Sequence, residues 1–254
     1  MAVHEGLEIS DSERLYELTR EGSLFRGCVF DEADLSSIDA DELEFEECSL
    51  RGTNFSGLAC QRFHVVDSDL ESARFENADM HEAEFVKSNC TSAIFRSAKL
   101  NLSRLIDCDM TVCNFDGANL FGADLSGSRF RGVDFSQANL SGNTVDGVDF
   151  SMATLRYKKF ATTKLSGVNF TEADLSGADF AGTEFTDCHL NSAVFNEETV
   201  FDGADLRGAT ISSSQLAVAS LKGAIVSAAQ AHTLLFEAYG IVVAEDAESF
   251  TKPR

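Results

Sequence analysis

The sequence predicts an all-β solenoid, in which short coils of chain stack along one axis around a narrow apolar core. Two observations predict this fold: an apolar residue recurs at every fifth position, and glycine keeps a fixed place in the same five-residue unit. A strand repeats every two residues and an α-helix every 3.6, so neither element explains a period of five. A unit this short cannot fold alone, and neighbouring units must stack to bury their apolar side chains.

The apolar period is long and nearly unbroken. Every fifth residue from Phe25 to Phe195 is apolar, which gives 35 positions, and after one inserted residue in "FNEETVF" the count resumes from Phe201 to Leu221 and reaches 40. Seventeen of the 21 phenylalanines occupy this central position. Because 44% of the chain is apolar, such a run has a chance probability on the order of 10^-14, and the repeat therefore defines the fold.

The other positions of the unit describe a corner. A small residue such as Ala33 or Cys48 lies two places before the centre, Asp or Asn often precedes the centre, and 15 of the 18 glycines fall two places after it. Glycine adopts positive φ in tight turns, and Asp or Asn side chains accept hydrogen bonds from turn amides. Each unit is therefore expected to point one large and one small side chain inward and then to turn.

The unit also carries a family resemblance. Ala-(Asp/Asn)-Leu-X-X occurs intact at 33–37, 118–122, 123–127, 138–142, 173–177 and 204–208. This motif resembles that of pentapeptide-repeat proteins, and the resemblance covers residues 23–226. It implies a right-handed quadrilateral β-helix with four repeats per coil, hence about ten coils with short helical caps. At the roughly 4.8 Å spacing of neighbouring strands the rod would be about 48 Å long.

Three segments are expected along the chain. Residues 1–22 are predicted to form an N-terminal cap with a helix in "SDSERLYELTREGS", residues 23–226 the β-helix, and residues 227–254 a C-terminal segment. In that last segment we expect a helix over 227–239 closed by Gly240, then a β-like stretch at 241–243 and a tail. Its apolar surface suggests a homodimer interface, made by Leu234, Leu235, Phe236 and Tyr239.

The residue types that carry chemistry show no pattern typical of an enzymatic, metal or cofactor site. All seven cysteines occupy inward positions of the repeat, which suits small buried hydrophobic residues, and they lack metal-ligand spacing. His64, His81 and His189 are expected to point outward from different coils, and no nucleophile, phosphate-loop or zinc motif is present. No membrane span or signal peptide is indicated, which suggests a cytoplasmic protein.

Negative charge is concentrated in two belts. The net charge is −22, yet residues 51–170 carry 14 acids against 13 bases. Nine acids without a base form the first belt: Asp31, Glu32, Asp34, Asp39, Asp41, Glu42, Glu44, Glu46 and Glu47. Nine more form the second belt: Glu172, Asp174, Asp179, Glu184, Asp187, Glu197, Glu198, Asp202 and Asp205. By the repeat register, all eighteen side chains are expected to face water.

Two interpretations of the belts remain open. An acidic surface keeps a rod with apolar rows soluble and suits an acidic interaction scaffold with some other protein partner. Alternatively, the carboxylates imitate duplex DNA, since about 48 Å of duplex at one charge per 1.7 Å would carry roughly 28 charges.

The C-terminal segment resembles that of quinolone-resistance pentapeptide-repeat proteins of the Qnr and MfpA types, in the order Gln230, Leu234, Leu235, Gly240, Ile241, Val242. This resemblance implies a tail-to-tail dimer that binds DNA gyrase or topoisomerase IV in place of DNA, modulates supercoiling or protects against quinolone-type poisons, and contacts neither nucleic acid nor membrane. The unbroken register is closer to MfpA, because Qnr-type rods carry loops that break the repeat.

Several residues break the size rule of the repeat. Lys158 occupies a small inward position, where local distortion or snorkelling of its side chain is expected. Ile38, Leu43, Leu58 and Phe63 are large at that position, which predicts that the first coils are less regular.

Overall fold

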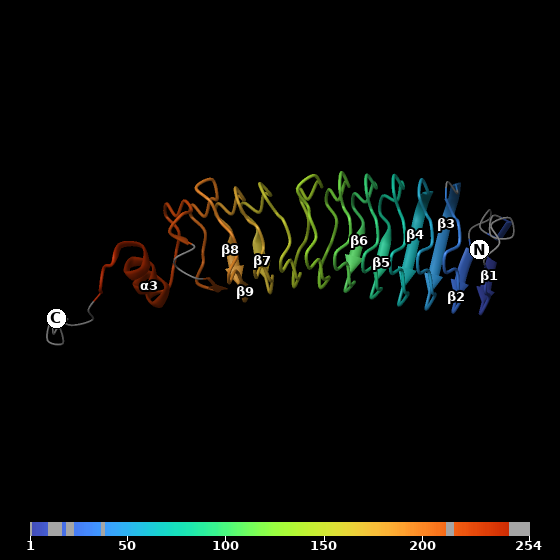
Figure 1. The fold of residues 1–254 in the computed structure, drawn as a ribbon, viewed down its shortest axis with the longest axis horizontal. Helices are drawn as coiled ribbons and strands as arrows, with labels where there is room; N and C mark the ends of the chain where they lie inside the picture. The colour runs from blue at the N-terminus through green and yellow to red at the C-terminus, as the bar shows by residue number, and fades with distance from the viewer. Residues whose placement is uncertain (1, 10–16, 19–22, 37–38, 212–215, 244–254) are drawn as a thin grey trace.

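The computed structural model describes residues 2–9, 17–18, 23–36, 39–211 and 216–243. These residues form a straight rod of about ten turns with the two ends of the chain at opposite ends of the rod (Figure 1). The rod is the predicted right-handed quadrilateral β-helix, which confirms the fold class.

Regular strands are short, because each face of a coil is only a few residues wide. Six of the ten strands form one sheet along a face of the rod, and β7 with β8 and β9 with β10 form two-stranded sheets. The strands are β1 (Ala2–Glu5), β2 (Ser23–Arg26), β3 (Asp39–Glu46), β4 (Ala59–Val66), β5 (Glu84–Val86), β6 (Arg104–Ile106), β7 (Lys164–Ser166), β8 (Glu184–Thr186), β9 (Cys188–His189) and β10 (Ala209–Thr210).

Neighbouring coils pair in parallel with a step of twenty residues, as four repeats per coil require. Phe25 is the partner of Phe45, and Val65 is the partner of Phe85. Isolated bridges continue this step on the other faces, for example from Asn114 to Asp134. The step rises to 21 at the predicted insertion, where Asp179 pairs with Val200.

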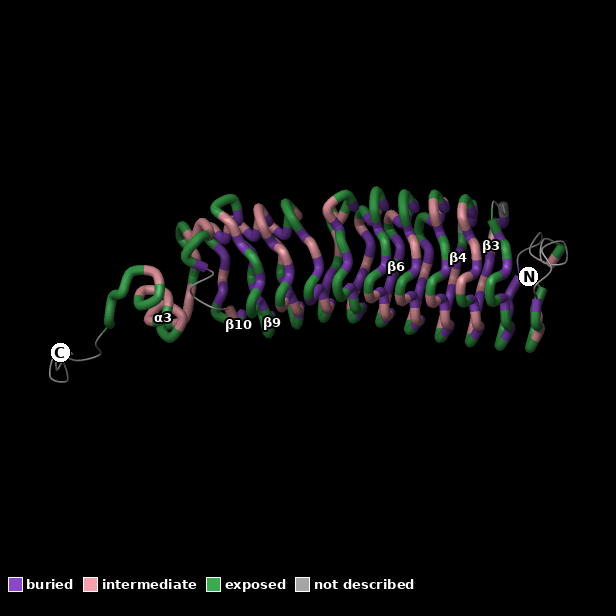
Figure 2. The backbone as a smooth tube through the Cα atoms, in the orientation of Figure 1, coloured by how far each residue is buried: buried purple, intermediate pink, exposed green. Residues whose placement is uncertain are grey.

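The apolar core runs along the axis of the rod. Buried residues recur in every coil and alternate with exposed ones (Figure 2). Phenylalanines stack between coils, as when the Phe75 ring lies 4.9 Å from the rings of both Phe55 and Phe95, nearly parallel to each. The core is therefore continuous, and each coil is stabilised mainly by its two neighbours.

The corners explain why Asp or Asn so often precedes the central residue. The side chain accepts a hydrogen bond from the backbone amide two residues on, as in Ser36 to Asp34 at 3.0 Å and Thr171 to Asn169 at 3.0 Å. The residue two places after the centre has positive φ, for example 66° at Gly117. These contacts agree with the corner that the repeat pattern predicts.

The first coils depart from this corner, as the large inward residues suggest. β3 and β4 each continue for eight residues. Leu43 and Phe63 fill the inward position within them and are almost completely buried. Ile38 lies outside the described residues.

The N-terminal segment differs from the expected helical cap over residues 2–9. β1 pairs in parallel with β2, the His4 ring stacks on Phe25 at 5.1 Å, and Ile9 is 2% exposed. His4 and Ile9 occupy central positions, so they extend the core by part of a coil. Residues 17 and 18 are helical, and the remainder of the stretch predicted as a helix, up to residue 22, lies outside the described residues.

At the other end the chain forms helix α3 (Ala228–Tyr239). Ser227 and Gln230 make a capping box at its start, and Gly240 ends it with a left-handed conformation at φ 65°. The side-chain amide nitrogen of Gln230 donates to the carbonyls of Leu206 and Ala209, which docks the helix on the last coil. Residues 241–243, expected to be β-like, belong to no strand in the described structure.

Candidate protein-binding surface

The acidic side chains of the two belts lie on the outside of the rod. Sixteen of the eighteen are described, and none of these sixteen is buried. The side chains of Asp39 and Asp41 lie outside the described part of the structure. Both belts are therefore accessible to a partner over the residues that the structure describes.

Some belt acids are neutralised by a cation. Five ion pairs involve them: Glu42 with Arg62, Glu46 with Arg26, Asp174 with Arg156, Glu184 with Lys164, and Asp205 with Arg207, at 2.5 to 3.2 Å. Exposed pairs of this kind contribute little to stability, but they reduce the charge that a partner meets.

The remaining belt acids carry uncompensated charge. Eleven have no ion pair with a lysine or arginine within the described ranges: Asp31, Glu32, Asp34, Glu44, Glu47, Glu172, Asp179, Asp187, Glu197, Glu198 and Asp202. Glu198 accepts a hydrogen bond from the Tyr157 hydroxyl at 2.9 Å, and Asp202 accepts one from the Ser220 hydroxyl at 2.6 Å. These bonds orient the two carboxylates without removing their charge.

The middle of the rod differs, because acids and bases are nearly equal in number there and half of its fourteen acids form an ion pair. Arg104 binds Glu84 at 3.0 Å, Lys99 binds Asp79 at 2.6 Å, and Arg129 binds Asp109 at 2.8 Å. The two belts are therefore separated by a section whose acids and bases nearly balance.

Hydrogen bonds favour the ionised form of two belt carboxylates, Asp34 and Asp205. The Ser36 hydroxyl and amide lower the pKa of Asp34, and the Arg207 guanidinium and amide lower the pKa of Asp205 to about 2. Both groups therefore carry a full negative charge at neutral pH.

Several belt acids occupy corners where the backbone favours glycine. Glu32, Glu47, Glu172 and Asp187 have φ between 52° and 60°, whereas most corners of this kind elsewhere in the repeat hold glycine or a small polar residue. An L-residue in this conformation costs about 1–2 kcal/mol. These carboxylates are therefore held at the surface at the expense of stability.

This strain gives a testable result. Glu172→Gly is expected to raise the free energy of unfolding by about 0.5–1 kcal/mol, because relief of the positive φ exceeds the greater entropy that glycine loses on folding. Urea denaturation of the variant against the native protein measures the change. Ser192→Gly repeats the test at the same corner one coil later, where φ is 58°. It should also raise the free energy of unfolding. Destabilisation by both changes would contradict the strain argument.

Within the described ranges, no group of three or more His, Cys, Asp or Glu side chains is arranged to hold a metal ion. All seven cysteines are buried, and burial raises the pKa of Cys48 to about 11 and that of Cys108 to about 12, so both remain protonated. No described helix is long and apolar enough to span a membrane.

The four predicted interface residues on the C-terminal helix differ in how far they are exposed. Leu234 packs against the core of the rod, and Leu235 is half-buried. Phe236 and Tyr239 are 60% and 72% exposed. The residues that follow, Ile241, Val242 and Val243, are also exposed and were expected only as a β-like stretch. The free apolar surface at this end is thus shifted toward the C-terminus from the predicted set.

A four-sided rod assembled from five-residue units is a solenoid repeat protein. Eight copies of the family model described as pentapeptide repeats match residues 21–57, 66–101, 113–151 and 163–197, together more than half of the chain. The chain belongs to the pentapeptide-repeat family.

Two solved structures are similar to the chain at low sequence identity. QnrB1, a plasmid-mediated fluoroquinolone resistance protein, is 19% identical with a TM-score of 0.44, and the match covers 92% of this chain and 98% of QnrB1. HetL, involved in heterocyst differentiation regulation in the cyanobacterium Nostoc sp. strain PCC 7120, is 21% identical with a TM-score of 0.35, and the match covers 86% of this chain and 94% of HetL. No curated protein matches the chain.

Proposed function

We propose that the protein is a non-enzymatic, cytoplasmic DNA mimic that binds DNA gyrase or topoisomerase IV and thereby modulates supercoiling or protects the enzyme from quinolone-type poisons. The observation that carries this proposal is the set of eleven belt carboxylates without an ion pair to lysine or arginine in the described structure. They lie on the outside of a narrow rod at two levels along its axis. Such a surface complements a basic protein channel built to hold a duplex.

The choice of partner rests on the C-terminal resemblance to Qnr- and MfpA-type proteins. The mechanism that we propose is competition: rod carboxylates take the place of phosphates on the enzyme and release the ions bound to its basic groups. Binding should therefore weaken as salt rises, because screening and ion release govern both processes.

Binding to purified gyrase and topoisomerase IV at two salt concentrations tests the proposal. We expect an affinity that falls at least tenfold between about 50 and 200 mM salt, and no binding to duplex DNA itself. Supercoiling and ciprofloxacin-induced cleavage assays then distinguish inhibition from protection. No binding at micromolar protein would reject a topoisomerase partner.

We further propose that the exposed end of α3 forms a homodimer. Phe236→Glu with Tyr239→Glu is expected to give a monomer of 27.5 kDa, whereas the native protein should have twice that mass, because charged side chains oppose burial of this apolar surface. Light scattering during gel filtration measures the mass. Phe121→Glu, at an exposed phenylalanine within the rod, is the control and should remain dimeric. A monomeric native protein would reject the dimer.

One observation favours the alternative, an acidic scaffold with a partner other than a topoisomerase. Leu102 and Phe121 are each 51% exposed, and they lie on adjacent coils in the nearly neutral middle of the rod, where the Leu102 amide donates to the Phe121 carbonyl at 2.8 Å. Phosphate imitation does not require such an apolar pair. Salt-insensitive capture of a partner that Phe121→Ala abolishes would support the scaffold.

A further inference from the structure

The stacking of coils is interrupted between residues 137–146 and the residues twenty positions later. One coil earlier on the same two faces, Asn119 bridges to Asn139, and Asp124 bridges to Thr144. In the described ranges no bridge continues from Asn139 to Lys159 or from Thr144 to Lys164. The backbone bonds that the repeat requires there, such as Leu140 N to Lys159 O, are absent as well. We call these the interrupted faces.

The same two turns of chain remain joined on either side of the interrupted faces. The Phe135 amide donates to Thr154 at 2.9 Å before the opening. After it, Gly147 donates to Ser166 and Phe150 donates to Asn169, both at 2.8 Å. Coils that are attached on two faces and parted on two have the geometry of a hinge.

Lys158 accounts for the first interrupted face. Ala138 and Ala178 occupy the equivalent inward position one coil before and after, and both are buried. The Lys158 ammonium donates to the carbonyls of Ala138 at 2.7 Å and Ser136 at 3.2 Å. By the repeat, the Ala138 carbonyl should instead accept the amide of Lys159, just as Ala118 accepts Asn139. The long side chain thus takes the acceptor and separates the coils. Burial also lowers the pKa of Lys158.

Asn143 occupies the inward position on the second interrupted face. Its amide nitrogen donates to the carbonyls of Leu120 and Ala123, on the preceding coil. Its side-chain oxygen is buried and has no hydrogen-bond partner in the described structure. The side chain therefore binds the coil before it and offers nothing complementary to the coil after it.

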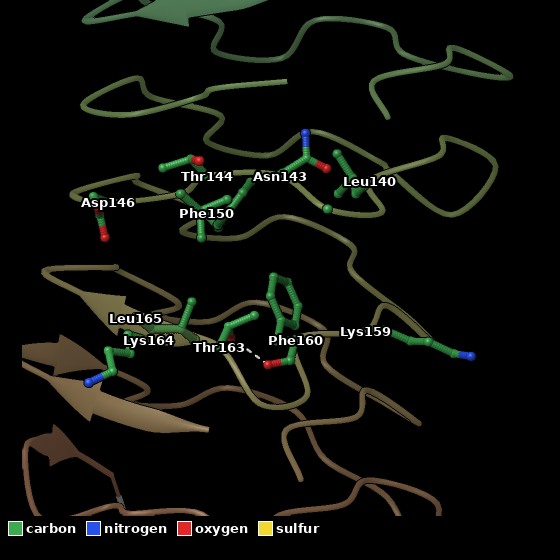
Figure 3. A pocket seen from close by; sticks show the side chains of 12 residues that line it. Leu140, Asn143, Thr144, Asp146, Phe150, Lys159, Phe160, Thr163, Lys164 and Leu165 are labelled. Carbon is green, nitrogen blue, oxygen red and sulfur yellow. Dashed lines mark hydrogen bonds between the residues drawn. The ribbon is translucent and has the colours of Figure 1, made fainter. Parts of the chain in front are cut away.

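A cavity of about 180 Å³ lies between the coils at the opening. In Figure 3, Leu140, Asn143 and Phe150 line one side and Phe160, Thr163 and Leu165 the other. A gap of this kind forfeits both dispersion contacts and hydrogen bonds. The coils are therefore held together less strongly here than on the two faces where the bonds remain.

We infer that the protein consists of two stiff arms joined by a hinge at the interrupted faces, with Lys158 as the wedge that holds the hinge open. The hinge lies between the first acidic belt (31–47) and the second (172–205), so bending changes the angle between them. Resting on the proposed function, this motion lets both belts follow a curved basic surface.

Amide hydrogen exchange of the full-length protein tests the hinge without any partner. Each amide at an interrupted face has a bonded equivalent one coil earlier, so the two sets form an internal comparison. The amides of Leu140, Gly142, Val145, Lys159 and Lys164 should exchange at least about tenfold faster than those of Leu120, Gly122, Leu125, Asn139 and Thr144. Equal protection of the two sets would overturn the hinge.

Lys158→Ala tests the wedge. Removing the ammonium and its stem should let the coils pair and slow exchange of the interrupted amides about tenfold, whereas Lys159→Ala, at an exposed neighbouring lysine, should leave exchange unchanged. Unchanged exchange in a folded Lys158→Ala protein would overturn the role of Lys158.

A disulfide across the opening tests bending independently, even if the Lys158→Ala protein fails to fold. Thr144→Cys with Lys164→Cys should cross-link more slowly than the control pair Asp124→Cys with Thr144→Cys, which joins bridged coils, and should then slow exchange. A cross-link that never forms while the control forms would show a rigid opening and overturn the hinge.

The oxidised cross-opening variant should bind gyrase about tenfold more weakly than its reduced form, with recovery in dithiothreitol. Unchanged binding would overturn the use of the hinge in recognition. If the native protein does not bind gyrase, the proposed function fails, and the exchange and cross-linking results still decide the hinge.

Discussion

Phe75→Ala is expected to lower the free energy of unfolding by about 3–5 kcal/mol. Phe75 is fully buried and its ring stacks between those of Phe55 and Phe95 at 4.9 Å. Alanine would leave a cavity that the coils above and below cannot fill, because their backbone spacing is fixed by hydrogen bonds. Urea denaturation followed by circular dichroism measures the loss.

Phe121→Ala is the matched control, since Phe121 is 51% exposed on the outside of the rod. Its removal should change the free energy of unfolding by less than about 0.5 kcal/mol. A loss at Phe75 no larger than the loss at Phe121 would contradict the central role of the stacked phenylalanines.

Reversal of three charges in the second belt is expected to weaken gyrase binding about 100-fold, which corresponds to about 2.7 kcal/mol. Glu172→Lys, Asp187→Lys and Glu197→Lys suit this test, because each carboxylate is exposed and has no ion pair with a lysine or arginine in the described part of the chain. On the proposed function, the lysines would repel the groups that normally hold phosphates. Fluorescence anisotropy with labelled protein measures the dissociation constant.

The control carries the same change in net charge outside the belts. Glu82→Lys, Asp107→Lys and Asp116→Lys lie in the nearly neutral middle and should weaken binding less than about fivefold. Equal losses for the two triple variants would mean that net charge, rather than the belts, governs association.

Much of the fold follows from the sequence, because one position of the repeat decides several contacts at once. Phe75 and Phe95 stack since a coil has twenty residues, and Asp34 accepts the Ser36 amide since it precedes the centre at a corner. Local pattern and tertiary packing have the same period in a solenoid, so a pattern read locally also predicts its neighbours.

The hinge is only partly visible in the sequence. Lys158 stands out because it is large and charged at a small inward position, but Asn143 resembles other polar residues that the repeat accepts, such as the buried Thr183. Thr183 donates its hydroxyl to the Phe160 carbonyl at 2.7 Å on an intact face. Whether a polar inward residue supports the next coil depends on the geometry of its bonds.

The candidate surface is likewise only partly predictable from the sequence. The outward direction of the belt acids follows from the register, and their ion pairs follow from the coil length, as Arg26 with Glu46 and Glu42 with Arg62 are each twenty residues apart. The packing of Leu234 on the core does not follow, because it depends on the angle at which α3 leaves the last coil.

Displacement of a labelled DNA duplex from purified gyrase tests the central claim most directly. If the rod occupies the DNA site, the native protein should displace the duplex at micromolar concentration, less effectively at higher salt, and the second-belt triple variant should fail. A complex that holds gyrase, duplex and protein together, or no displacement at any salt concentration, would contradict DNA mimicry.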